Sequence, residues 1–213
     1  MTPIGTVLGN SGLDHVFIDE SIAKRRGGKR QSYLIAAVFI KEGQQEEIRL
    51  QLERLLLPGQ IKLHWTDESL KRRRKLCKAV ASICPLTVII EHVAVPQKKT
   101  ERFRRKCLEH LYATIGQESI ASITMETCTP HQNMKDIEHF RYFCGHIFPQ
   151  ELRVEHVRGG DEPLLWIPDI VLGAVNAAAL GDASFLSTIS HAIAVREYTA
   201  DSLATRPEQN ERP

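Results

Sequence analysis

The chain has 213 residues, which is enough for one domain with a substantial hydrophobic core and does not require a second domain. Hydrophobic residues make up 42% and charged residues 25%, which is ordinary for a soluble globular protein. The formal net charge of +2 is too small to indicate a class of partner.

The five cysteines are odd in number, scattered and never arranged as Cys-x-x-Cys. This pattern argues against a disulfide framework and against a thiolate zinc site, and it is typical of a reducing compartment. Residues 1–13 lack the basic start and apolar run of a signal peptide, and no uninterrupted apolar stretch is long enough to span a bilayer. We therefore expect a cytoplasmic protein that does not associate with membranes.

The first part of the chain predicts a hairpin followed by helices. Residues 14–20 and 33–40 are apolar enough for two strands, and the paired glycines in the basic run 24–30 predict a hairpin tip or loop between them. A connection of about ten residues favours antiparallel pairing of these strands. Apolar residues at helical spacing predict one helix over 48–56 and another over 70–81.

Strands and helices alternate through the rest of the chain. The predicted elements are strand 86–95, helix 103–115, strand 120–126, helix 132–147, strand 151–157, helix 164–180 and an outer helix over 184–198. Helix 164–180 is apolar on almost every side, which predicts that it is buried. We expect one three-layer α/β domain over residues 1–199, with a central mixed β-sheet flanked by helices, and a disordered tail over 200–213.

Three acids lie at the end of, or inside, a segment that otherwise buries itself: Asp19, Glu126 and Asp169. An ionised carboxylate beside apolar strands costs several kcal/mol unless a positive charge compensates it. If strands 14–20 and 120–126 are parallel neighbours, their carboxyl ends coincide, and Asp169 could point to the same edge from the start of its helix.

A divalent metal ion would compensate this cluster of carboxylates. Mg²⁺ prefers octahedral oxygen coordination, usually with protein carboxylates, waters and phosphate oxygens, and Mn²⁺ would serve equally. Two such ions about 4 Å apart could activate a water and stabilise the leaving oxygen of a phosphodiester. The cluster therefore predicts nuclease chemistry.

Several short motifs occur together in this chain. They are Phe17-Ile18-Asp19-Glu20-Ser21, Leu63-His64 before a basic helix, the acid that ends strand 120–126, and Trp166-Ile167-Pro168-Asp169-Ile170-Val171-Leu172-Gly173-Ala174. Over about residues 14–180, the chain resembles the family catalogued as domain of unknown function thirty-eight hundred. The resemblance implies a ribonuclease-H-like (RNase H-like) fold, with Asp19, Glu126 and Asp169 as metal ligands, Glu20 assisting and His64 near the site.

The chain departs from that family at two of these positions. It has Glu126 where the family commonly has an aspartate, and Trp166-Ile167-Pro168-Asp169 where Gln-x-Ala-Asp is common. Glutamate can still ligate a metal with a longer reach, whereas Pro168 stiffens the approach to Asp169. These departures leave open a module that keeps the fold but has a degraded site.

The proposed site residues also have simpler interpretations. Strand alternation places Asp19 and Glu20 on opposite faces, which makes Asp19 the principal candidate and Glu20 an auxiliary. Glu126 could begin a polar turn, and Asp169 could be a first-turn acid that complements the helix dipole. His64, which precedes Trp65, could equally be a partly buried structural histidine or a group that moves protons.

Three further acids leave alternatives open. Glu91 interrupts strand 86–95 and could replace one of the ligands, although an edge position or an arginine partner explains it as well. Asp161 and Glu162 lie in a predicted loop and could reach the site, but loop acids are more often solvated. In a third interpretation, the chain is a structural subunit whose acids form buried ion pairs with its arginines.

Positive charge is concentrated in three runs, at residues 24–30, 71–75 and 98–106. Such runs are usually solvated, yet three of them flanking an acidic edge could form a rim that binds phosphate. We therefore predict a divalent-metal-dependent nuclease or related phosphodiester hydrolase with RNA or DNA as its partner. The alternative is a non-catalytic nucleic-acid-binding or interaction module.

Overall fold

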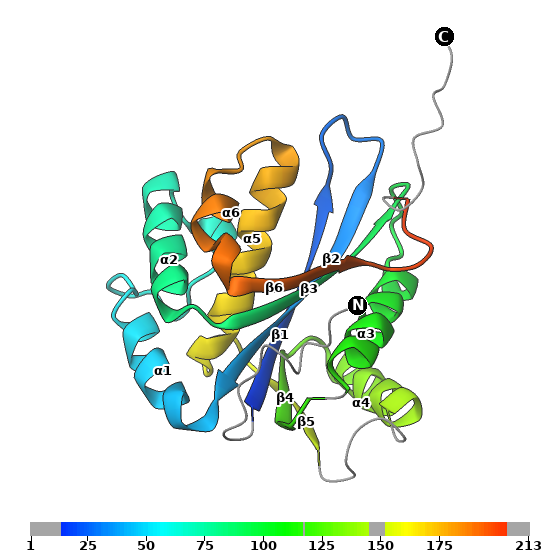
Figure 1. Ribbon diagram of the computed structural model, residues 1–213, viewed down its shortest axis with the longest axis horizontal. Coiled ribbons are helices and arrows are strands. Elements are labelled where there is room, and N and C mark those ends of the chain that lie inside the picture. The colour runs from blue at the N-terminus through cyan, green and yellow to red at the C-terminus, as the bar shows by residue number, and fades with distance from the viewer. Residues whose placement is uncertain (1–13, 117, 145–151, 204–213) are drawn as a thin grey trace.

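The computed structural model describes residues 14–116, 118–144 and 152–203. Its centre is a six-stranded sheet with the strand order β5-β4-β1-β2-β3-β6 (Figure 1). The strands are β1 (Asp14–Lys24), β2 (Gln31–Lys41), β3 (Leu86–Ala94), β4 (Ile120–Glu126), β5 (Arg153–Val157) and β6 (Ile193–Tyr198). Strand β2 is antiparallel to its neighbours β1 and β3, and the other pairs are parallel.

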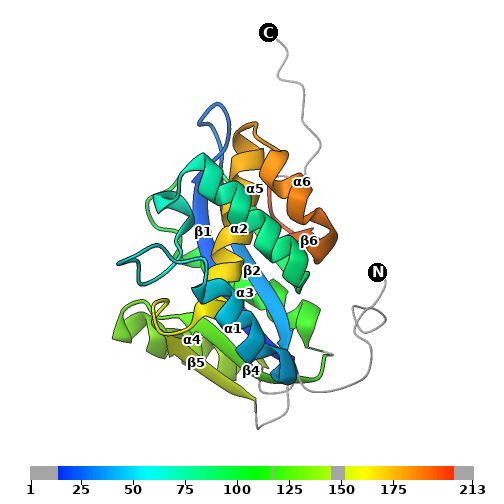
Figure 2. The ribbon, with the colours of Figure 1, turned by 90° about the vertical axis from the view of Figure 1, so that its left-hand side faces the viewer.

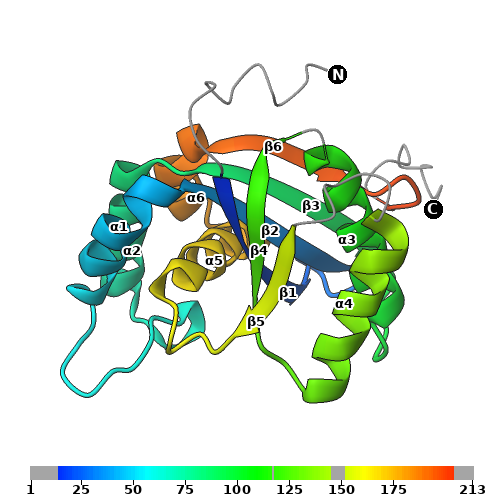
Figure 3. The same cartoon turned by 90° about the horizontal axis from the view of Figure 1, so that it is seen from below.

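Helices cover both faces of the sheet (Figures 2 and 3). One layer, here called the α5 layer, contains α1 (Gln45–Glu53), α2 (Leu70–Ile83), α5 (Trp166–Leu180) and α6 (Ser184–Ile189). The other, the α3 layer, contains α3 (Glu101–Ile115) and α4 (Pro130–Cys144). This arrangement confirms the predicted three-layer α/β fold around a mixed sheet.

The predicted hairpin is confirmed, because β1 and β2 pair antiparallel along their whole lengths. Strand β2 is buried at almost every position, as expected for a nearly continuous apolar strand covered on both faces. The tip between the strands contains Gly27 and Gly28, both with positive φ, a conformation that glycine adopts without steric cost.

Helix α5 is the central helix of its layer, as its apolar sequence predicts. It follows a short 3₁₀ helix, η4 (Pro163–Leu165). The segment Pro163–Leu180 is long and apolar enough to cross a membrane by length and composition, but two thirds of it is buried against the rest of the protein. Its apolar surface is therefore used in the core.

The predicted outer helix over 184–198 is wrong in its second half. Helix α6 ends at Ile189, a 3₁₀ helix follows over Ser190–Ala192, and the chain then enters β6, which pairs in parallel with β3. Alternately exposed residues along β6 fit the edge of a sheet, and β3 supplies the hydrogen bonds that a short helix would have supplied.

The C-terminal boundary also differs from the prediction. Residues 200–203, predicted as the start of a disordered tail, pack against β3, where Ser202 is fully buried and its hydroxyl accepts a hydrogen bond from the amide of Val93. Residues 145–147, the predicted end of the helix starting at 132, and residue 151, the predicted start of a strand, lie outside the described residues.

Candidate functional site

Three segments meet where β1 separates from β4. The two strands pair in parallel up to the partners Ile18 and Met125, and the next residues along each strand are Asp19 and Glu126. Strand β1 itself continues to Lys24 against β2, so Asp19 lies inside the strand and not at its end as predicted. Asp169, on α5, lies close enough that its charge acts on Asp19. The structure therefore brings these three acids close together, as expected if the two strands are parallel neighbours.

Of the three acids, Asp19 has the negative charge that positive groups compensate least. Burial, followed by the negative charge of Asp169 and then that of Glu126, raises the pKa of Asp19 to about 8. Its Oδ1 accepts a hydrogen bond of 2.7 Å from the backbone amide of Glu20. Within the described part of the chain, Asp19 forms no ion pair. It is an acid that keeps its proton near neutral pH unless a cation arrives.

Asp169 is held by the segment that precedes α2. The backbone amide of Trp65 donates to its Oδ2 at 2.7 Å, and His64 Nδ1 lies 3.4 Å from its Oδ1. Burial raises the pKa of Asp169, and these two contacts offset the effect only in part. The imidazole of His64 is 41% exposed, so it can exchange protons with solvent.

Glu126 is paired with Lys62, a residue that the sequence did not indicate. Lys62 Nζ donates to Glu126 Oε1 at 2.8 Å. Partial burial alone would lower the pKa of Lys62, but Glu126, Asp169 and Asp19 together raise it. Lys62 therefore lies within the field of all three carboxylates. The signal available in the sequence was its position beside the apolar residue Leu63, two residues before His64.

Two glycines leave room for the side chains of Glu126 and Trp65. A Cβ atom on Gly159 would lie 2.5 Å from Glu126 Oε1, and one on Gly173 would lie 2.2 Å from the ring of Trp65. Trp65 also meets the edge of Phe185 at a centroid distance of 5.1 Å and carries the guanidinium of Arg73 4.9 Å from its ring centre. The segment that bears Lys62 and His64 is thus anchored on α5.

Glu20 faces the α3 layer, as strand alternation predicts. Its Oε2 accepts hydrogen bonds from Arg104 Nε at 2.6 Å and from the Tyr33 hydroxyl at 2.5 Å. Arg104 also forms a bidentate pair with the buried Asp136, to which His156 Nε2 lies 3.2 Å away. The carboxylate of Glu20 is therefore committed to an ion-pair network on the opposite face from Asp19.

Of the other acids considered, Glu91 and Glu162 have protein partners and Asp161 is exposed. Glu91 is 1% exposed and pairs with Arg25 and Arg196. An arginine partner was one of the explanations considered for this acid. Glu162 accepts from the amide of Leu164 and pairs with Arg49. Asp161 is exposed in the turn before η4. These contacts give no support to a ligand role for any of the three.

The described residues contain no group of three or more His, Cys, Asp or Glu side chains already arranged to hold a metal ion. Lys62 engages Glu126, while Trp65 and His64 engage Asp169, so these carboxylates are directed to protein partners. The chemistry of the three carboxylates nevertheless suits Mg²⁺ or Mn²⁺, which prefer oxygen donors, although the described side chains are not arranged around one metal position. Lys62 contacts Oε1 of Glu126, so an ion bound by Glu126 would share that carboxylate with the ammonium group of Lys62 or displace it.

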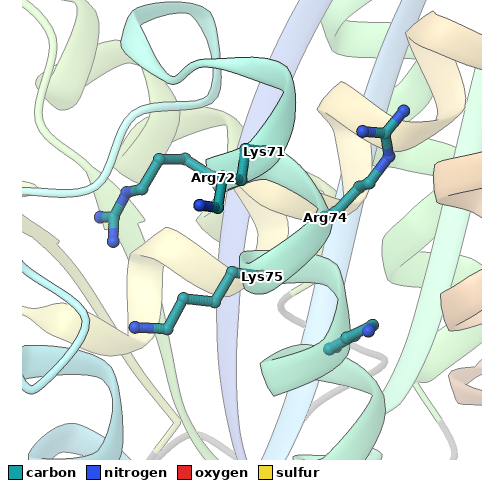
Figure 4. A pocket seen from close by; sticks show the side chains of 5 residues that line it. Lys71, Arg72, Arg74 and Lys75 are labelled. Carbon is teal, nitrogen blue, oxygen red and sulfur yellow. The ribbon is translucent and has the colours of Figure 1, made fainter.

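Positive side chains form a ridge along the exposed face of α2. The basic ridge consists of Lys71, Arg74, Lys75 and Lys78, which with Arg72 line a surface hollow (Figure 4). Their spacing places them on one side of the helix. None of the four ridge residues forms an ion pair within the described ranges. By contrast, the run 98–106 lies on and before α3, and its Arg104 is buried in the network just described.

Comparison with known proteins assigns the chain to no family: no protein-family model matches it, and no curated protein matches it significantly.

Proposed function

We propose that this protein is a divalent-metal-dependent phosphodiester hydrolase, most simply a nuclease, whose site is formed by Asp19, Glu126 and Asp169. The observation that carries the proposal is the environment of Asp19. This acid is buried beside two further carboxylates and has no ion-pair partner in the described structure. A divalent ion would relieve this repulsion. The family resemblance implies the same three ligands and an RNase H-like fold, which we retain as part of the proposal.

Hydrolysis of a phosphodiester needs a nucleophile, a proton acceptor and stabilisation of the phosphate. A water oxygen forms a bond to phosphorus, the bond to the leaving oxygen breaks, the water gives up a proton and the leaving oxygen gains one. A bound Mg²⁺ or Mn²⁺ would supply Lewis-acid stabilisation and ease ionisation of the water. Asp169 orients the His64 imidazole, which is exposed enough to accept or deliver a proton.

The basic ridge on α2 would hold the nucleic-acid backbone. Helix α2 begins three residues after the short 3₁₀ helix η3 (Trp65–Asp67), and the residue just before η3 is His64. Cations on such a ridge bind successive phosphates without reading sequence. This placement favours a polymeric substrate over a small phosphate ester.

The direct test is hydrolysis of single-stranded, double-stranded and hybrid nucleic acids in the presence of Mn²⁺. We expect cleavage by the wild-type protein, a loss of at least about 100-fold in Asp19→Asn and Asp169→Asn, and no loss in Glu138→Gln, an exposed acid on α4. Failure to cleave any substrate, or full activity in both site variants, would rule out the proposal.

A second candidate is a nucleic-acid-binding module without catalysis. It is favoured by the absence, among the described residues, of a group of acids already arranged around a metal position, combined with the free basic ridge. It predicts salt-sensitive binding that is unchanged by EDTA and by Asp19→Asn, with no cleavage of any substrate.

A further inference from the structure

We propose that Lys62 is the second cation of this site, so that the site takes a single divalent ion together with the Lys62 ammonium group. This inference rests on the proposed hydrolase function and specifies how its charge is balanced. In two-metal phosphodiester hydrolysis, both cations stabilise the attacking and leaving oxygens. Here one of these positions would be filled by a side chain of the protein.

The number of charges favours one metal ion. Asp19, Glu126 and Asp169 carry three negative charges when ionised, and Lys62 carries one positive charge. One divalent ion neutralises the remainder, whereas two divalent ions would leave the site with an excess of two positive charges before the substrate binds. Because low-dielectric surroundings strengthen such repulsion, the second ion would bind poorly.

The placement of Lys62 is set by the residues that follow it in the chain. Leu63 is 1% exposed in the core of the α5 layer, and Trp65 is packed on Gly173 and bonded through its amide to Asp169. The Lys62 side chain is 35% exposed, which leaves its ammonium group accessible to a bound phosphate. A lysine tethered in this way stays in the site after Glu126 turns to a metal ion.

An ammonium group at this position has a defined chemical role. Its three N–H groups can donate to a non-bridging phosphate oxygen and to one carboxylate at the same time. It would therefore stabilise the negative charge that builds up on the phosphate as water adds, without transferring a proton. Lys62 would then be a catalytic residue by direct contact with the substrate.

The test measures metal stoichiometry separately from activity. Calorimetric titration of metal-free protein with Mn²⁺ should give one ion per chain for the wild type and for Lys62→Arg. In Lys62→Met, removal of the positive charge should tighten Mn²⁺ binding by about tenfold or more, while cleavage falls by about 100-fold or more. Lys135→Met, on the exposed surface of α4 in the other layer, should match the wild type in both measurements. Thermal unfolding of each variant verifies that it is folded.

The outcomes separate this inference from the proposed function. Two Mn²⁺ ions per wild-type chain would overturn the role of Lys62 and leave the hydrolase proposal intact. Faster cleavage by Lys62→Met would also overturn it, because Lys62 would then only compete with the metal. If neither the wild type nor Lys62→Met binds Mn²⁺, the hydrolase proposal itself is wrong.

Discussion

The indole ring of Trp65 lies directly on Gly173, so closely that a Cβ atom on this glycine would be 2.2 Å from the ring. Gly173 is one helical turn after Asp169 on α5, so the two residues share a face of the helix. That face receives both the Trp65 ring and, through Asp169, the Trp65 amide. The segment 62–65 is thereby fixed at two points against one helix.

Gly173→Ala is expected to displace Trp65 and with it Lys62 and His64. No rotation of a flexible side-chain end relieves a 2.2 Å approach to a ring, so the ring or the helix must move. We expect a loss of about 1–3 kcal/mol in the free energy of unfolding, measured by urea denaturation, and a loss of the proposed cleavage activity.

Gly43→Ala is the matched control for this prediction. At Gly43, no atom lies within 4 Å of the position that a Cβ would occupy, and the backbone does not have positive φ. It should unfold within about 0.5 kcal/mol of the wild type. Equal stability of both variants would show that Trp65 is not closely packed on Gly173.

Asp19→Asn is expected to stabilise the metal-free protein, and increasingly so as the pH rises. The pKa of Asp19 is about 8 in the folded protein against an ordinary value of 3.8. The stability of the protonated form is therefore complete below about pH 4 and is lost as the pH rises through about 8. The gain in Asp19→Asn should be near zero at pH 4 and on the order of 2 to 4 kcal/mol at pH 9.

This pH dependence is measured by urea unfolding of both proteins at several pH values in EDTA. Glu138→Gln removes an exposed acid of α4 and should follow the wild type throughout. A constant difference between Asp19→Asn and the wild type across the range would mean that Asp19 is not buried beside the other two carboxylates.

Arg104→Met is expected to be strongly destabilising, because it leaves the carboxylates of Glu20 and Asp136 without their common partner. Removing one partner of a buried ion pair typically costs about 3–5 kcal/mol. Arg105→Met, at the next and exposed position of α3, should cost less than about 0.5 kcal/mol. A similar small cost for both arginines in chemical denaturation would contradict the network.

Neutralising the basic ridge should weaken the proposed nucleic-acid binding and reduce its dependence on salt. Replacement of Lys71, Arg74, Lys75 and Lys78 by glutamine removes four potential phosphate contacts. The slope of log K against log salt should fall by about 3, measured by fluorescence anisotropy at several salt concentrations.

Four cations of the α3 layer that take no part in the Arg104 network provide the control for this prediction. They are Arg102, Arg105, Lys135 and Arg141. Their replacement by glutamine changes the net charge equally but lies on the opposite face of the sheet from α2. An equal effect of both sets on the slope would show that binding follows net charge and not the ridge.

The sequence predicted the elements that form the core and the residues brought together by them. Asp19 and Glu126 could be singled out because each follows an apolar run predicted as a strand, and Asp169 because its helix is too apolar to lie on the surface. Their meeting was expected on the condition that the two strands are parallel neighbours, which the structure shows. Periodicity carries this information because each element must bury its apolar side.

The contacts between segments could not be predicted in this way. Lys62 lies in a short irregular segment, and its proximity to Glu126 depends on how Trp65 packs on α5. Strand β6 was missed because six residues are too few to distinguish a strand from the end of a helix, and its pairing with β3 is a tertiary property. Both features depend on partners distant in the sequence.

Glu20 connects the α3 layer to the carboxylate of Asp19. Its backbone amide donates to Asp19 on one face of the sheet, while the carboxylate of the same residue is held by Arg104 on the other. Helix α3 thereby helps to orient the carboxylate of Asp19 from the opposite side of the sheet. Natural variation in α3 and α4 would therefore alter the affinity of the proposed site for a metal ion on the far side of the sheet, and selection on that site would extend to residues remote from the proposed substrate.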